Sequence, residues 1–96
     1  MKKLFFLIFI ALGLHAATIT QEQPACISES LLDEFFNAIH NNDTRQIFVL
    51  VAQSKCFILK PGQNVSIIKR GFTQVTLRLY YEDGTYKVVA PIESIQ

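Results

Sequence analysis

Alternation of polar and apolar residues is most regular in the C-terminal half of the chain. The run 74–79, Gln-Val-Thr-Leu-Arg-Leu, changes character at every position. Successive side chains of a strand point to opposite faces, so this run predicts a half-buried antiparallel strand. Neighbouring apolar runs are separated from it by the turn signals Lys60-Pro61-Gly62, Arg70-Gly71 and Asp83-Gly84. Residues 55–90 are therefore predicted to form short antiparallel strands joined by tight turns, in a small curled sheet.

Upstream of these strands the apolar residues follow a helical period. The positions that share one face of a 3.6-residue helix are Leu31, Leu32, Phe35, Phe36 and Ile39. Ser28 or Ser30 can cap the N-terminus of this helix with a side-chain oxygen. Asn41 and Asn42 are expected to end it, because Asn tolerates the left-handed conformation.

The next segment, residues 44–53, fits two structures. Asp43 with Gln46 three residues later resembles a helix cap, which favours a helix. The uninterrupted apolar run 47–51 also has the composition of a buried strand. The cap and the short Asn-Asn-Asp link favour the helix, and the two segments together predict a helical hairpin over about 29–53.

The N-terminus has the pattern of a secretory signal peptide. Lys2 and Lys3 precede an apolar stretch that ends near Leu14, followed by small residues. This stretch is shorter than the roughly 20 apolar residues of a spanning helix. We expect cleavage after Ala16, with an uncleaved anchor as the alternative. Cys26 lies too far downstream to be the lipid-bearing first residue of a lipoprotein.

Removal of residues 1–16 leaves a flexible lead-in, 17–26, and a single α+β domain, 27–96. The polar composition and Pro24 favour disorder in the lead-in. Two of the nine Lys and Arg residues leave with the leader, so seven remain against eight Asp and Glu residues. This balance argues against nucleic acid or an anionic membrane surface as the partner.

The two cysteines, Cys26 and Cys56, are predicted to form a disulfide. In an exported chain a single pair most simply forms one bond. The bond would close a loop of about 30 residues. In the chain-entropy description, closing such a loop stabilises the folded state by roughly 3 kcal/mol. Free or intermolecular thiols, and a metal site, are the alternatives. His40 is the one histidine left beyond the leader, and two thiols with one imidazole lack a fourth zinc ligand.

The spacing of apolar residues and glycines in the C-terminal half resembles the small SH3-like β-barrels of exported bacterial proteins. The residues that carry this resemblance are Cys56, Leu59, Gly62, Val65, Ile67, Val75, Leu77, Leu79, Gly84, Tyr86 and Val88. The resemblance implies a helical hairpin at the N-terminus of the domain, packed on an SH3-like partial β-barrel. Such barrels often carry a surface tryptophan in a peptide groove, and this chain has none. No functional residue is transferred from the family.

Residue types that support catalysis are few. His40 stands near the end of the predicted helix, where a solvated, dipole-stabilised imidazole is expected. No phosphate-binding Gly-rich loop is present in the sequence. We therefore predict no catalytic residue, no metal and no cofactor, and expect that the protein is not an enzyme.

Aromatic residues near the Asp-Gly turn are the candidate binding face. The residues are Phe72, Tyr80, Tyr81 and Tyr86. Tyrosine is enriched in protein interfaces, which favours a binding role. Cross-strand aromatic packing is the alternative.

The sequence thus predicts a small exported protein, periplasmic or secreted, that acts as a non-catalytic interaction module. Its expected partner is a protein or a cell-wall component. A secreted inhibitor or effector, and a small enzyme, are the alternatives. Retention in the periplasm would favour the module, and release into the medium would favour the inhibitor or effector.

Overall fold

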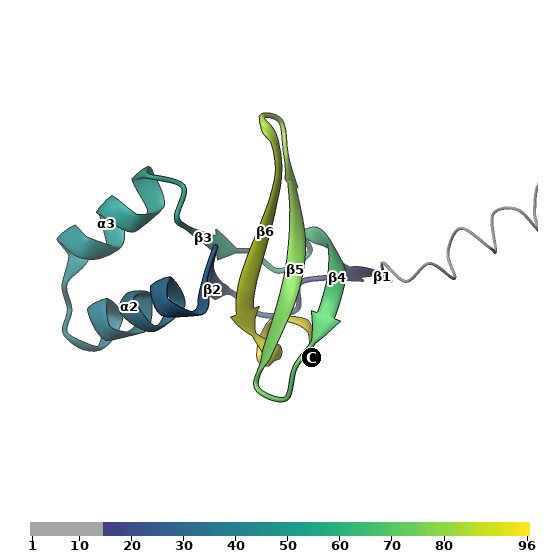
Figure 1. Ribbon diagram of the computed structural model, residues 1–96, viewed down its shortest axis with the longest axis horizontal. Coiled ribbons are helices and arrows are strands. Elements are labelled where there is room, and N and C mark those ends of the chain that lie inside the picture. Colours follow the sequence, from purple (N-terminus) through teal and green to yellow (C-terminus); the bar gives the residue numbers. More distant parts are fainter. Residues whose placement is uncertain (1–14) are drawn as a thin grey trace, which may run out of the picture.

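The computed structural model describes residues 15–96, which form one six-stranded antiparallel sheet and a pair of helices beside it (Figure 1). The strands are β1 (His15–Thr18), β2 (Gln23–Cys26), β3 (Cys56–Leu59), β4 (Asn64–Arg70), β5 (Gln74–Tyr81) and β6 (Gly84–Pro91). The helices are α2 (Glu29–His40) and α3 (Thr44–Ala52), and a 3-10 turn, η1 (Ile92–Ile95), closes the chain. The sheet order is β1-β4-β5-β6-β2-β3.

The position of the helices corrects the predicted architecture. The expectation was an N-terminal helical hairpin packed on an SH3-like partial barrel, and it was wrong. The described chain begins with two strands, and α2 and α3 are inserted between β2 and β3, which pair with each other. The helices lie to one side of the strands rather than across the sheet (Figure 1). The protein is therefore roughly α+β, with the sheet as its larger part.

One face of the sheet carries the larger hydrophobic core. In β5 the buried residues are Val75, Leu77 and Leu79, which alternate with half-buried polar ones. Their partners across the ladder include Val65 and Val88. Ile19, in the link between β1 and β2, is 1% exposed and packs into the same cluster. The alternation read from the sequence therefore places the core correctly, because the side-chain period of a strand is two.

The two helices begin at side-chain caps. Ser28 accepts a hydrogen bond from the backbone N–H of Leu31, and Asp43 accepts one from that of Gln46. After α2, Asn42 takes φ 54°, the left-handed conformation expected there. The segment 44–53, for which helix and strand were both considered, is helical as α3. None of the helices within residues 15–96 has the length and apolar character needed to cross a membrane.

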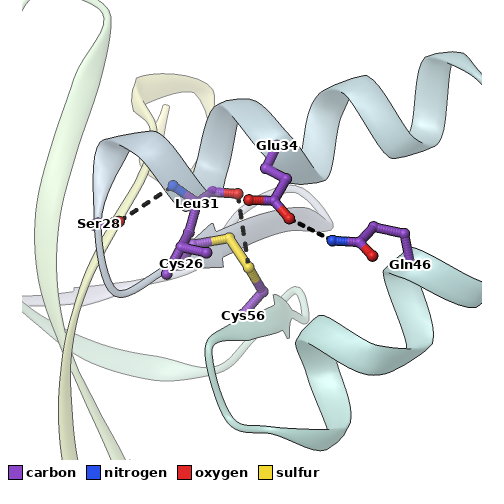
Figure 2. The surroundings of a disulfide bond; sticks show 6 residues. All are labelled: Cys26, Ser28, Leu31, Glu34, Gln46 and Cys56. Carbon is purple, nitrogen blue, oxygen red and sulfur yellow. Dashed lines mark hydrogen bonds between the residues drawn. A yellow bond between two sulfur atoms is a disulfide. The ribbon is translucent and has the colours of Figure 1, made fainter.

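The predicted disulfide, Cys26–Cys56, stands at the base of the helical insertion. The two residues are direct partners across β2 and β3, with their Cα atoms 4.0 Å apart. Both are fully buried in a second, smaller core with Leu32, Phe35 and Leu50. Figure 2 shows Sγ of Cys56 close to the carbonyl of Leu31 in the first turn of α2. The bond therefore fastens the helical pair to the sheet at the point where the chain leaves and re-enters it.

The segment predicted as a flexible lead-in is ordered. Residues 17–26 contain the end of β1, the buried link residue Ile19 and the whole of β2. β1 pairs with β4, 46 to 52 residues away (Thr18 with Asn64, His15 with Ile67), and β2 pairs with β3, 30 to 36 residues away (Cys26 with Cys56, Gln23 with Leu59). A local sequence pattern does not indicate such distant pairing. The predicted leader lies outside the described residues except for His15 and Ala16, which pair with Ile67 and Ser66. The expected cleavage point therefore falls inside β1.

Candidate functional site

A groove of about 550 Å³ lies between the end of α3 and the β5–β6 hairpin. One wall is the end of α3, the floor is β3, and the other wall is the distal part of the hairpin. The lining residues are Val51, Ser54, Cys56, Phe57, Ile58, Tyr81, Glu82, Asp83 and Tyr86. A volume of this size falls within the range of ligand-binding clefts.

Three aromatic rings form an apolar cluster in the groove. The ring of Phe57 stacks on Tyr81 with centroids 5.6 Å apart and lies 4.9 Å from Tyr86. Tyr81 and Tyr86 meet edge to face at 5.9 Å. These separations are those of favourable aromatic pairs. Tyr81 nevertheless keeps 40% of its surface exposed, so the cluster is open to a ligand.

The strand register explains why these tyrosines meet. Leu79 is opposite Tyr86, and Tyr81 is opposite Gly84, so both tyrosines lie on the face that carries the larger core. Their side chains extend that core past its buried part toward the turn. Gly84 has φ 140°, which L side chains rarely adopt, and this glycine allows the tight turn after Asp83. The Asp-Gly signal thus places the two rings beside each other.

Carboxylates occupy the hairpin end of the groove. The Tyr86 hydroxyl donates a hydrogen bond to Oδ2 of Asp83 at 2.7 Å. This bond, followed by burial and the charge of Asp83, raises the pKa of Tyr86, because ionisation would lose the donated proton beside a carboxylate. Glu82 and Asp83 are both exposed. Among the described residues that line the groove there is no Lys, Arg or His. Its electrostatic character is therefore acidic.

The predicted binding face is divided by the structure. Tyr81 and Tyr86 lie in the groove, whereas Tyr80 lies on the opposite face of β5. The hydroxyl of Tyr80 is 2.6 Å from Oγ of Ser66. Phe72, in the β4–β5 turn, is 98% exposed and does not line the groove. The four aromatic residues therefore do not form one surface.

Of the residues that line the groove, only Tyr81 and Tyr86 belong to the predicted binding face, and Phe57 and Val51 are among those that the sequence missed. Phe57 lies in the run Cys-Phe-Ile-Leu, whose uniform apolar character hides which side chain faces which side. Val51 belongs to α3, which the structure brings beside β3 through the disulfide and the packing of the two helices. The hydrogen bond between Gln46 and Glu34 also links α3 to α2 (Figure 2). The direction of the Phe57 side chain follows from its pairing with Ala25 across β2 and β3, which the sequence does not indicate.

The remaining chemical candidates lie apart from the groove. His40 is the last residue of α2 and is exposed. Within residues 15–96, no group of three or more His, Cys, Asp or Glu side chains is placed to hold a metal ion. The groove itself presents aromatic rings, aliphatic side chains and two carboxylates, which is a surface suited to recognition.

Comparison with known proteins assigns neither a family nor a function to the chain. No family model, curated protein or solved structure matches the chain. The geometry of the groove therefore carries the functional interpretation.

Proposed function

We propose that the protein is a non-catalytic interaction module of the periplasm or the extracellular space, and that the groove binds a segment of a partner protein. The observation that carries the proposal is the open aromatic cluster of Phe57, Tyr81 and Tyr86 beside two carboxylates. Aromatic anchors in a concave site supply much of the binding energy in protein interfaces.

The surrounding chemistry supports recognition over catalysis. His40, the histidine considered for catalysis, is exposed and does not line the groove, which makes the enzymatic alternative less favoured. The aliphatic wall at Val51 and the aromatic floor suit apolar side chains, and the acidic end suits a cation. An exported location is supported by the buried disulfide, because such bonds persist in oxidising compartments. A secreted inhibitor or effector would use the same groove and differ only in its release.

The chain offers a closely matched pair of variants for the test. Tyr81 and Tyr80 are adjacent, similarly exposed at 40% and 49%, and lie on opposite faces of β5. Each hydroxyl also has one hydrogen-bond partner, Gln63 for Tyr81 and Ser66 for Tyr80. Replacement of either ring by Ala removes one hydroxyl hydrogen bond and a similar exposed area, but only Tyr81→Ala also removes the aromatic contacts with Phe57 and Tyr86 and changes the groove.

The experiment is a selection from a displayed peptide library on the immobilised protein, followed by affinity measurements on both variants. Loss of a central aromatic anchor typically costs about 2 kcal/mol or more, so we expect Tyr81→Ala to weaken the selected peptides at least about tenfold. Tyr80→Ala should leave the affinities within about twofold of the unmodified protein. Equal effects of the two substitutions, or the absence of any selected peptide, would contradict the proposal. Fractionation of the producing cells distinguishes the two interpretations: retention in the periplasm favours the interaction module, and release into the medium favours the inhibitor or effector.

A further inference from the structure

Strand β3 has one paired edge and one edge that faces the groove. It stands at the end of the sheet order and pairs with β2 alone among the described strands. Beyond the disulfide, the N–H of Ile27 donates to the carbonyl of Lys55 at 2.9 Å. In an antiparallel ladder, hydrogen-bonded and non-hydrogen-bonded pairs alternate. Cys26 and Cys56 therefore form a non-hydrogen-bonded pair.

This register fixes the direction of the backbone groups in β3. The N–H and C=O groups of Phe57 and Leu59 point toward β2, and those of Cys56 and Ile58 point away from it. Cys56 and Ile58 both line the groove. Among the hydrogen bonds of residues 15–96 outside the sheet ladders, none uses the backbone N–H or C=O of Cys56 or Ile58. Cys56 is fully buried and Ile58 is half-buried, so Ile58 presents the accessible edge groups. Accessible unpaired edge groups are a template for another strand.

We propose that the groove binds an extended segment of a partner protein as an added strand beside β3, a mode that rests on the proposed function. The backbone of the segment exchanges hydrogen bonds with the N–H and C=O groups of Ile58, as in other complexes formed by strand addition. Its side chains alternate between two surroundings. One set faces the aromatic cluster, and the other faces Val51 and Ile58 on the helix side.

Charge and shape specify the segment further. Glu82 and Asp83 lie at the hairpin wall, and the groove lining contains no cation to neutralise them. A Lys or Arg on the aromatic side of the segment would pair with these carboxylates and lie against tyrosine faces. The side chains of the segment that face α3 are apolar, to match Val51 and Ile58. The occupant is therefore an extended segment in which basic and apolar residues alternate.

A second copy of this chain fits the groove less well. Its own β3 lies between the same two walls, the end of α3 and the β5–β6 hairpin. Pairing of two recessed edges would bring these walls against each other, whereas a single extended segment can enter between them. The edge thus favours a flexible segment over a folded copy of the same domain.

Ile58 provides a backbone test of strand addition. Ile58→Pro removes the N–H that faces the groove and leaves the ladder to β2 intact, since Pro is tolerated where a strand's N–H is unpaired. Ile58→Ala shortens the same side chain and keeps the N–H. The probe is a labelled heptapeptide of alternating Lys and Val, with the alternating Glu and Val peptide as its control, measured by fluorescence anisotropy.

We expect the Lys/Val peptide to bind the unmodified protein, and the Glu/Val peptide to bind at least about tenfold more weakly. Ile58→Pro should bind the Lys/Val peptide at least about fivefold more weakly than Ile58→Ala, which corresponds to the loss of one net hydrogen bond. Equal binding by the two Ile58 variants, or no binding of the Lys/Val peptide, would overturn strand addition. If Tyr81→Ala weakened binding of the Lys/Val peptide while the two Ile58 variants bound it equally, the groove would remain the binding site and only strand addition would be rejected.

A second measurement applies if Ile58→Pro fails to fold. Two versions of the Lys/Val peptide carry backbone N-methyl groups on alternate residues. One version blocks the N–H groups of one edge of the extended peptide, and the other version blocks those of the opposite edge. An added strand uses one peptide edge, so one methylated peptide should lose at least about tenfold in affinity and the other should bind normally. Equal losses would overturn the proposal. A dimer of the unmodified protein in sedimentation, abolished by Ile58→Ala or Ile58→Pro, would assign the edge to a second copy instead.

Discussion

The two hydrophobic clusters of residues 15–96 differ in composition. The larger contains ten buried residues from the sheet and the β1–β2 link, and each is an ordinary aliphatic side chain. The smaller contains five buried residues, and two of them are the cysteines of the disulfide. The first cluster consists of aliphatic side chains alone, whereas the second also contains a covalent link. Small domains commonly supplement a limited core in this way.

The helices show how little area the smaller cluster buries. Leu50 is the one buried residue of α3, while Phe48 on the same helix is 72% exposed. In α2, Phe36 and Ile39 are exposed at 39% and 45% although they belong to the predicted apolar face. The groove lies where the two clusters meet, with β3 contributing residues to both. Its shape therefore depends on the disulfide that holds the helices beside the sheet.

The largest effect is expected from a deletion in the larger core. Leu77 is fully buried and lies opposite both Ile67 and Val88. Leu77→Ala should lower the free energy of unfolding by about 2–5 kcal/mol, because it removes transfer energy and leaves a cavity. The measurement is chemical denaturation, with Thr76→Ala on the opposite face as the control. A loss below about 1 kcal/mol would show that the sheet core is not the main source of stability.

Removal of the disulfide should have the next largest effect and should act on a different region. Cys26→Ser with Cys56→Ser, or addition of a reductant, is expected to cost about 2–4 kcal/mol, because the unfolded chain is no longer constrained. The melting temperature should fall by more than about 10 °C, at about 4–8 °C per kcal/mol. Both cysteines should resist alkylation in the native, unreduced protein, since their sulfur atoms are joined in the disulfide.

Hydrogen exchange locates the effect of the disulfide. After reduction the amides of α2 and α3 should lose protection before those of β5, because the smaller cluster has little other support. Simultaneous loss throughout the chain would show that the two clusters unfold as one unit. Quantitative alkylation of both cysteines without reductant would instead show that the thiols are free.

The cap of α2 offers a smaller test of the helical region. Ser28→Ala removes the acceptor for the N–H of Leu31 and should cost about 1 kcal/mol. Ser30, which the sequence left as an alternative cap, lies inside the first turn of α2. Ser30→Ala should therefore be neutral or slightly stabilising, since Ala has the higher helix propensity. The reverse order of these two effects, measured by thermal unfolding, would assign the cap to Ser30.

The smallest effect concerns Tyr86 at the groove. Its raised pKa means that the neutral phenol, hydrogen-bonded to Asp83, is the favoured form in the folded state. The resulting stabilisation is fully present below the unfolded pKa of 10.0 and is lost as the pH rises through the higher folded value. Asp83→Asn should shift one tyrosine transition to lower pH in an absorbance titration, and Asp33→Asn should not. If the tyrosine titration of Asp83→Asn were unchanged, the Asp83 carboxylate would not be the cause of the raised Tyr86 pKa.

Local chemistry by itself determined much of this protein. The alternation over 74–79 defined the core face of β5, and the Asp-Gly pair defined the β5–β6 turn. A cap at each helix start and two cysteines were enough to predict α2, α3 and the disulfide. These features depend on residues that are neighbours in sequence, or on a pairing for which only one partner exists.

Tertiary structure decided the features that need distant partners. β1 and β2 are four residues each and exist because β4 and β3 complete their hydrogen bonds, so residues 17–26 appeared unstructured in sequence. The same pairing turned an expected N-terminal helical hairpin into an insertion between two neighbouring strands. It also brought Phe57 to the groove, which Phe72 does not line. The separation of Tyr80 from Tyr81 needs no distant partner, since adjacent residues of a strand face opposite sides. A strand's register is set across the sheet, and a one-residue change of register exchanges the faces of all its side chains.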